Sequence, residues 1–219
     1  HYVENGTQDP EPGLPGYKFD LQSNSMAYEH RLPGGFTVGA AYIQNALDLT
    51  VDIGPAKASV NSKLGALYAD YLGRQYYLEG AVALGSHKFN LTRGITVGSI
   101  AHTADSHHSG NSFSGLVTAG MYRKLGSVNV DPYASLMYTS LKEDRFAEAG
   151  AESVNLIVSS RTAASLASEL GVRVSCVIPA GNSTFIPELL LAWNHEWSGQ
   201  RSLTAAFEGA PDELLTIRG

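Results

Sequence analysis

The sequence predicts an all-β protein, specifically an antiparallel up-and-down transmembrane β-barrel, and three observations support this. Apolar and polar residues alternate with a period of two over stretches of ten or more residues, the pattern of strands whose two faces meet different surroundings. Short Gly-containing turns alternate with longer polar connections. Only 16% of the residues are charged, whereas about 25% is usual for a soluble domain.

Length and composition limit the other classes. The 219 residues are expected to form one domain spanning 1–219. No apolar run approaches the roughly 20 residues of a membrane-spanning helix. A net charge of -6 without a Lys/Arg cluster excludes nucleic acid as a partner. The lone Cys176 has no partner for an internal disulfide. The chain opens without a signal peptide, so we expect it to be mature or to begin partway through a longer protein.

The clearest strand pair runs from Leu166 to Trp197, with a turn at 179–182. Each strand has at least ten residues, enough to cross a bilayer core at a tilt of ~45°. The segment Arg161 to Leu170 also fits an amphipathic helix, but the period of two that continues to Cys176 favours a strand.

Three further hairpins bring the predicted strand number to about eight. Their strands lie at 17–32 and 36–42, at 67–71 and 76–84, and at 113–122 and 128–139. The segments expected as loops are 1–16, 47–59, 87–111, 142–161 and the tail after Ser198.

Short turns on one rim and long loops on the other are typical of an outer-membrane barrel. The turn rim, at 33–34, 73–74, 126 and 180–181, is predicted to be periplasmic and the loop rim extracellular. The residues predicted to face lipid are Leu170, Val172, Val174, Leu189, Leu191 and Trp193. Those predicted to face the lumen are Glu79, Asp131, Glu169, Arg173, Glu188 and Asn194. Ile186 and Leu190 are exceptions to the alternation.

The sequence gives little reason to expect catalysis, a metal or a cofactor. His102, Asp105, His107 and His108 have metal-ligating side chains, but neighbours in one loop rarely converge, so a solvated loop is the preferred interpretation. There is no G-x-S-x-G motif, so no catalytic residue is assigned and the domain is not expected to be an enzyme.

Five segments resemble the translocator barrel of autotransporters. They are PYASLMYT (132–139), FAEAGAESVNL (146–156), SLASELGVRVS (165–175), PELLLAWNHEW (187–197) and LTAAFEGAPDELLTIRG (203–219). The resemblance is close over 128–219 and weaker from Gly16 to Arg93. It implies a twelve-stranded barrel in the outer membrane of Gram-negative bacteria, threaded by a helix that leads to an exported passenger.

The chain departs from the family at both ends. The threading helix and first strand are expected to lie before His1, and the last three strands after Gly219. The strands 17–32 and 183–197 should therefore not pair with each other. Mostly small lumen residues fit a bound helix, whose diameter is ~10 to 12 Å.

The resemblance implies a type V secretion translocator that anchors and exports its passenger. Its implied partners are outer-membrane lipid, its own passenger and linker helix, and the barrel-assembly machinery. The six lumen residues would contact the helix, or would only pair with one another and hold water. A porin-like diffusion channel is the alternative function, and a soluble β-barrel binding module is a third.

Overall fold

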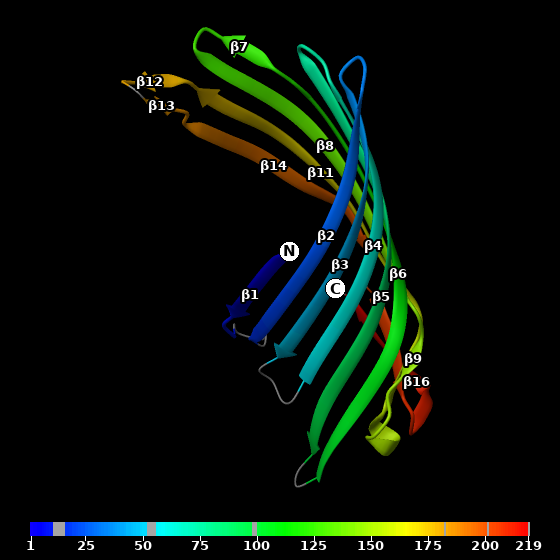
Figure 1. Cartoon of the computed structure of the whole chain (residues 1–219). Coiled ribbons are helices and arrows are strands. Elements are labelled where there is room, and N and C mark those ends of the chain that lie inside the picture. Colours follow the sequence, from blue (N-terminus) through cyan, green and yellow to red (C-terminus); the bar gives the residue numbers. More distant parts are fainter. Residues whose placement is uncertain (11–15, 52–55, 98–99, 182, 201, 219) are drawn as a thin grey trace.

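The computed structural model describes residues 1–10, 16–51, 56–97, 100–181, 183–200 and 202–218, most of them in β-strands (Figure 1). The only helical element in these ranges is the short 3-10 turn η1 (Glu152–Val154). No helix in the described part of the chain is long and apolar enough to cross a membrane.

The principal sheet is built from ten strands among the described residues. In chain order they are β1 (Tyr2–Gln8), β2 (Tyr17–Leu32), β3 (Phe36–Val51), β4 (Ala56–Leu72), β5 (Tyr76–Val97), β6 (Ile100–Met121), β7 (Arg123–Leu125), β8 (Val128–Glu143), β11 (Arg161–Cys176) and β14 (Glu188–Gln200). Each strand pairs antiparallel with its neighbour in the order β1-β2-β3-β4-β5-β6-β8-β11-β14, and β7 pairs with the start of β8. This is an up-and-down meander, as the alternation predicts.

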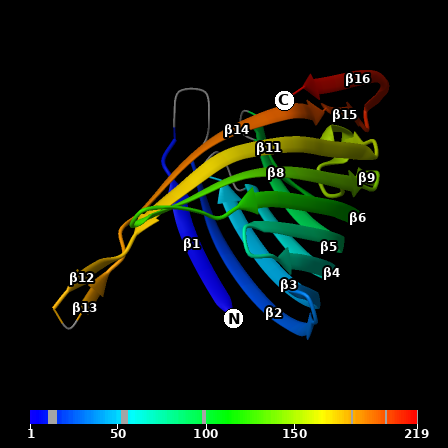
Figure 2. The same cartoon turned by 90° about the horizontal axis from the view of Figure 1, so that it is seen from above.

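The sheet curls into an open trough, with β1 and β14 at the two ends of the strand order (Figure 2). β2 pairs with β1 and β3, whereas β14 pairs with β11. The prediction that strands 17–32 and 183–197 are not hydrogen-bonded to each other is confirmed. The sheet is not closed, and the twelve strands of the family are not reached within the described residues.

Four segments that were expected to be loops contain strands, so these four loop predictions were wrong. β3 and β4 extend across most of 47–59, and β5 and β6 pair from Tyr76–Met121 to Val97–Ile100, so 87–97 and 100–111 belong to two long paired strands. Residues 52–55 and 98–99 lie outside the described residues. Part of 1–16 forms β1, and the tail forms β15 (Ser202–Phe207) and β16 (Ala210–Arg218). In the β5–β6 part both faces carry many polar side chains, so the alternation that predicts strands is lost there.

The segment 161–170, which also fitted a helix, belongs to β11 and pairs with β8 from Arg161 onward. The turn region after Cys176 forms a small hairpin of β12 (Ile178–Ala180) and β13 (Ser183–Phe185), and Asn182 between them lies outside the described residues. Gly181 supplies a left-handed backbone there, with φ of 62°.

A second, four-stranded sheet lies at the end of the trough opposite the short turns (Figure 1). It contains β9 (Phe146–Ala147), β10 (Leu156–Val158), β15 and β16 in the order β16-β15-β10-β9. Four of the five buried hydrophobic side chains of the described chain belong to this region, namely Ala151, Val158, Ala205 and Ala206. We call this sheet and the 144–160 connection the cap.

Candidate functional site

The two sets of residues expected to face lumen and lipid lie on opposite faces of the main sheet. Strand register shows this directly, since Glu79 aligns with Thr118, Ser135, Glu169 and Asn194 across β5, β6, β8, β11 and β14. We call the face with Glu79 the inner face and the opposite one the outer face. Asp131, Arg173 and Glu188 also belong to the inner face, and the six apolar residues of β11 and β14 belong to the outer face.

Leu190, an exception to the alternation, is on the inner face because it aligns with Arg173. Ile186 lies between β13 and β14, outside the named strands.

A polar row crosses the inner face from β2 to β14. Its members in register are Arg31, Thr37, Asp70, Glu79, Thr118, Ser135, Glu169 and Asn194. Thr118 and Ser135 hydrogen-bond through their hydroxyls at 2.9 Å. Eight polar side chains side by side would cost much free energy in a dry core, so this row indicates a wall that faces water or a polar partner.

Next to the polar row, charged and aromatic side chains surround a cavity of about 270 Å³. It is lined by Tyr77, Glu79, Thr118, Tyr122, Asp131, Tyr133 and Arg173. Arg173 Nε lies 3.2 Å from Glu188 Oε1, and the Tyr133 hydroxyl donates to Glu169 Oε1 at 2.5 Å. The structure thus brings Glu79, Asp131 and Arg173 to one cavity and joins Arg173 to Glu188, while Glu169 is held by Tyr133.

Tyrosine rings on the inner face lie over glycines of the neighbouring strand. A Cβ added at Gly120 would lie 2.3 Å from the Tyr77 ring, and one added at Gly171 would lie 2.3 Å from the Tyr133 ring. Some of the small residues that indicated a wide lumen therefore accommodate these rings instead of leaving open space. The sequence analysis did not include Tyr77 and Tyr133 among the inner-face site residues. Their spacing of two residues from Glu79 and Asp131 places them on the same face.

At the cap end of the inner face, the His108 ring is stacked between two aromatic rings. Its centroid lies 4.8 Å from that of Phe89 and 4.1 Å from that of Phe146, in planes 11° and 9° apart. The His108 side chain is only 2% exposed, and its Nε2 lies 3.5 Å from Glu143. Burial lowers the pKa of His108 below its usual range, an effect that Glu143 partly offsets.

Arg161 holds Glu143 on its other side, with Nη2 donating to both carboxylate oxygens at 2.7 and 3.0 Å. A second ion pair anchors the cap. Arg93 of β5 donates to Glu148 Oε1 at 3.0 Å and to the Val154 carbonyl at 3.1 Å. These contacts fasten the 144–160 connection to the strand ends.

The residues considered for a metal site do not converge. His107 and His108 are neighbours in β6, so their side chains lie on opposite faces, and His107 bonds to Asn90 at 2.7 Å. No group of three or more His, Cys, Asp or Glu in the described ranges is arranged to hold a metal.

The outer face carries a band of exposed apolar side chains next to the turn rim. Tyr28 is 72% exposed, Leu84 is 67% exposed and Leu67 is 63% exposed. Aromatic rings lie at both edges of the band. The ring centroids of Phe36 and Tyr71 lie 4.8 Å apart near the turns, and those of Phe113 and Tyr138 lie 6.2 Å apart at the far edge. An apolar band between two aromatic girdles is the pattern of a barrel in a bilayer.

Comparison with known proteins identifies the family. Residues 2–217 match the autotransporter beta-domain family. The chain is 26% identical over 227 residues to Outer membrane protein A of Rickettsia conorii and of Rickettsia rickettsii, with 98% of the chain covered in both cases. It spans about a tenth of the length of these relatives, 11% and 10%.

Two solved structures share the fold. The translocator domain of autotransporter NalP from Neisseria meningitidis aligns with a TM-score of 0.69 at 18% identity, covering 87% of this chain and 69% of that chain. The beta domain of the Bordetella autotransporter BrkA aligns with a TM-score of 0.58 at 18% identity, covering 92% and 81%. The family match extends along nearly the whole chain, and the open meander has a polar inner face and an apolar outer band. The chain therefore belongs to the autotransporter β-domain family of outer-membrane translocator domains.

Proposed function

We propose that this domain anchors an N-terminal passenger in the bacterial outer membrane and holds the linker to that passenger within its lumen during export. The observation that carries the proposal is the opposition of the two faces, with the polar row and the Arg173 cluster inside and the apolar band outside. Lipid offers no hydrogen-bond partner to the backbone, so paired strands with such a band suit a bilayer.

The six inner residues have the chemistry to meet a helical linker. Glu79, Asp131, Glu169 and Glu188 supply carboxylates, Arg173 supplies a cation, and Asn194 supplies an amide. With four acidic side chains and one cation, these six residues have a net negative charge, which favours a linker bearing Lys or Arg. Because export requires no bond to be broken in this domain, the proposal gives none of these residues a catalytic role.

Orientation is part of the proposal. The turns at Gly34, Gly126 and Gly181 are placed on the periplasmic side, and the cap with the long strand ends on the outside, because outer-membrane barrels have short periplasmic turns. The outer face is placed against lipid. The assembly machinery of the outer membrane, which would insert the barrel, is the remaining proposed partner.

Surface display of the passenger tests the function. An epitope placed in the full-length protein upstream of His1 should be detected by antibody on intact cells, and trypsin added to such cells should cut at Arg145 in the cap but not at Lys124 near the opposite rim. An epitope that is reached only after the outer membrane has been permeabilised would contradict export.

The diffusion-channel alternative is tested by conductance. The full-length protein in planar bilayers should show small, interrupted currents because the linker occupies the lumen. A stable open pore that conducts equally with and without the upstream region would favour a channel.

A further inference from the structure

The outer face changes from apolar to polar between two adjacent rows of residues. The last apolar row, in register across β2 to β6, consists of Met26, Tyr42, Gly65, Leu84 and Phe113. The next row on the same face consists of Asn24, Gln44, Lys63, Ser86, Asn111 and Lys142. Two residues along a strand advance it by about 7 Å, so the polar row begins directly at the edge of the band.

The row after that is also polar or small. It consists of Gln22, Ala46, Asn61, Lys88 and Ser109. Together the two rows contain three lysines and no acidic residue, although the whole chain has a net charge of -6. Acidic side chains return at the end of the second row, where the Asp144 N–H donates to the Ser109 carbonyl, and in the third row, where Asp20 aligns with Asp48. Two further lysines, Lys18 and Lys57, align with Thr50 in the fourth row. Within the strands, the two rows at the boundary of the apolar band therefore carry only positive charges.

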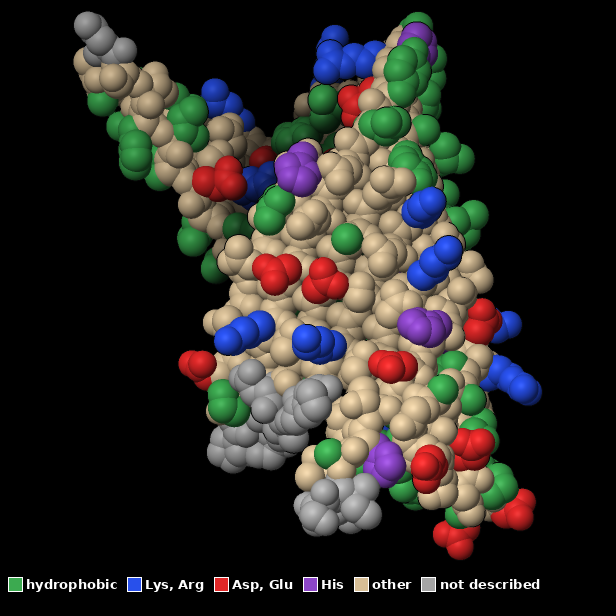
Figure 3. All heavy atoms as spheres, turned by 60° about the horizontal axis from the view of Figure 1, so that its bottom comes forward, with side chains coloured by type: hydrophobic (Ala, Val, Ile, Leu, Met, Phe, Trp, Pro, Cys, Tyr) green, Lys and Arg blue, Asp and Glu red, His purple; other side chains and the backbone are tan. Residues whose placement is uncertain are grey.

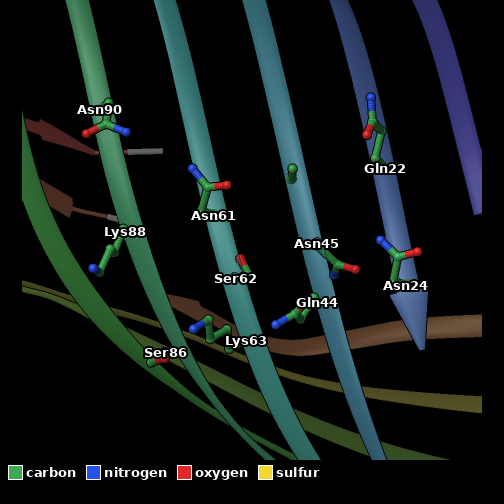
Figure 4. A pocket seen from close by; sticks show the side chains of 11 residues that line it. Gln22, Asn24, Gln44, Asn45, Asn61, Ser62, Lys63, Ser86, Lys88 and Asn90 are labelled. Atoms are coloured by element: carbon green, nitrogen blue, oxygen red, sulfur yellow. The ribbon is translucent and has the colours of Figure 1, made fainter. Parts of the chain in front are cut away.

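Part of this boundary is hollowed. A cavity of about 560 Å³, a size typical of sites for small ligands, spans β2 to β5 at this boundary. Most of its lining residues hold outer-face positions, while Asn45 and Ser62, which align with each other, hold inner-face positions. We call its principal lining residues, Asn24, Gln44, Asn61, Lys63, Ser86 and Lys88, the amide-lysine patch. Figure 4 shows these side chains on four neighbouring strands, and Figure 3 shows charged side chains scattered over the polar part of the surface.

The donors and acceptors of the patch are available for a ligand. Lys63 and Lys88 are exposed and form no ion pair with any described residue. Gln44 donates to the Tyr42 hydroxyl at 2.9 Å, which holds this amide at the edge of the apolar band. Amide groups both donate and accept hydrogen bonds, as sugar hydroxyls require, and ammonium groups pair with phosphate.

We propose that the amide-lysine patch binds the headgroup of a phosphorylated glycolipid of the outer leaflet. The acyl chains of such a lipid would lie along the apolar band, its phosphates would meet Lys63 and Lys88, and its sugar hydroxyls would meet the amides. A soluble sugar phosphate would gain nothing from the adjoining band, whereas a lipid uses both surfaces at once. The inference rests on the orientation given under the proposed function, because it requires this rim to face outward.

Native mass spectrometry of the full-length protein in neutral detergent tests the proposal, with diphosphorylated lipid A as the probe. The wild-type protein should retain lipid A in preference to phosphatidylglycerol and to dephosphorylated lipid A. The double variant Lys63→Gln/Lys88→Gln should bind lipid A about thirtyfold more weakly, since each of the two lysines contributes on the order of 1 kcal/mol near an anionic surface. Arg74→Gln/Lys124→Gln, which removes two cations near the opposite rim, should bind like the wild type.

An amide variant separates sugar recognition from simple charge attraction. Gln44→Leu/Asn61→Leu should weaken lipid A binding and leave the weak binding of phosphatidylglycerol unchanged. Unchanged lipid A affinity in the lysine variant, or equal binding of lipid A and phosphatidylglycerol by the wild type, would overturn the proposal. Resistance of each folded barrel to detergent at room temperature confirms that the variants fold.

The assay is independent of export. If the epitope upstream of His1 is displayed on cells while the lysine variant binds normally, the patch is refuted and the translocator function stands. If binding depends on the lysines but the epitope is never displayed, the translocator function fails and the lipid site stands.

Discussion

At the scale of single residues, one position along a strand separates two environments. Arg173 and Val172 are neighbours, yet Arg173 lies 3.2 Å from Glu188 on the inner face while Val172 aligns with Leu191 on the outer face. A shift in register by one residue would exchange them and would place a charge against lipid.

Cysteine labelling measures this facing. In a Cys176→Ala background of the full-length protein in bilayers, Arg173→Cys and Glu188→Cys should react with a water-soluble maleimide, because the inner face is wet. Val172→Cys and Leu189→Cys should react only with a membrane-permeant reagent. The reverse pattern would show that the register is wrong by one residue.

A charge introduced on each face provides a stability test at the same scale. Leu191→Arg places the cation on the outer face and should lower the free energy of unfolding by ~2 to 4 kcal/mol, the cost of Arg near the bilayer midplane. Asn194→Arg places the same side chain on the inner face opposite Glu169, where it should be tolerated. Urea unfolding in lipid vesicles compares the two, and equal losses of stability would contradict the assignment of faces.

At the scale of elements, the long β5–β6 hairpin and the cap form one unit beyond the apolar band. Phe146 of β9 stacks on His108 of β6, and Arg93 of β5 binds Glu148. Asn155 donates to Glu208 at 2.8 Å, which ties the 144–160 connection to the region between β15 and β16. The cap is thus held by a few defined contacts, and changes at those contacts should loosen it.

Acidification should loosen the cap through His108. Because its pKa is lowered in the folded protein, the neutral ring is the favoured form, and its contribution to stability is present above pH about 6.5 and is lost as the pH falls below that value. Hydrogen exchange at Phe146 and Ala147, corrected for intrinsic rates, should be faster at pH 5 than at pH 7.5.

The variant His108→Phe is the matched control for this effect. It keeps an aromatic ring between Phe89 and Phe146 but cannot be protonated, so the pH dependence of exchange at Phe146 should be much smaller than in the wild type. His87, whose ring bonds to Ser62 and Ser112, remains in both proteins and cancels in the comparison. A pH effect of the same size in the variant would assign it to another group.

At the scale of the whole molecule, the main sheet is open within the described residues, and the separation of β2 from β14 can be measured. Thr118→Cys with Ser135→Cys should form a disulfide on mild oxidation, since these residues are directly opposite in β6 and β8. Ser25→Cys with Ala192→Cys, and Ala27→Cys with Ala192→Cys, should not form one, because β2 and β14 do not pair. Efficient coupling of either second pair in the full-length protein would mean that these strands meet.

Much of the architecture was predicted from the sequence because alternation is a local property. The residue order in Leu166 to Cys176 and in Leu189 to Trp193 determines which side chains share a face, whatever the rest of the chain does. The Gly-containing turns determine where the chain reverses, and the family resemblance follows from the same segments. These features fixed the fold class, the hairpins and the separation of the lumen and lipid sets onto opposite faces.

Only the tertiary structure decided how far the strands extend and what they enclose. In 87–97 and 100–111 both faces are largely polar, so alternation vanishes although β5 and β6 remain paired there. The stacking of Phe146 on His108, the tyrosine rings over Gly120 and Gly171, and the rows that form the amide-lysine patch join residues far apart in sequence. Such contacts depend on the register between strands, and a single strand's sequence does not contain that register.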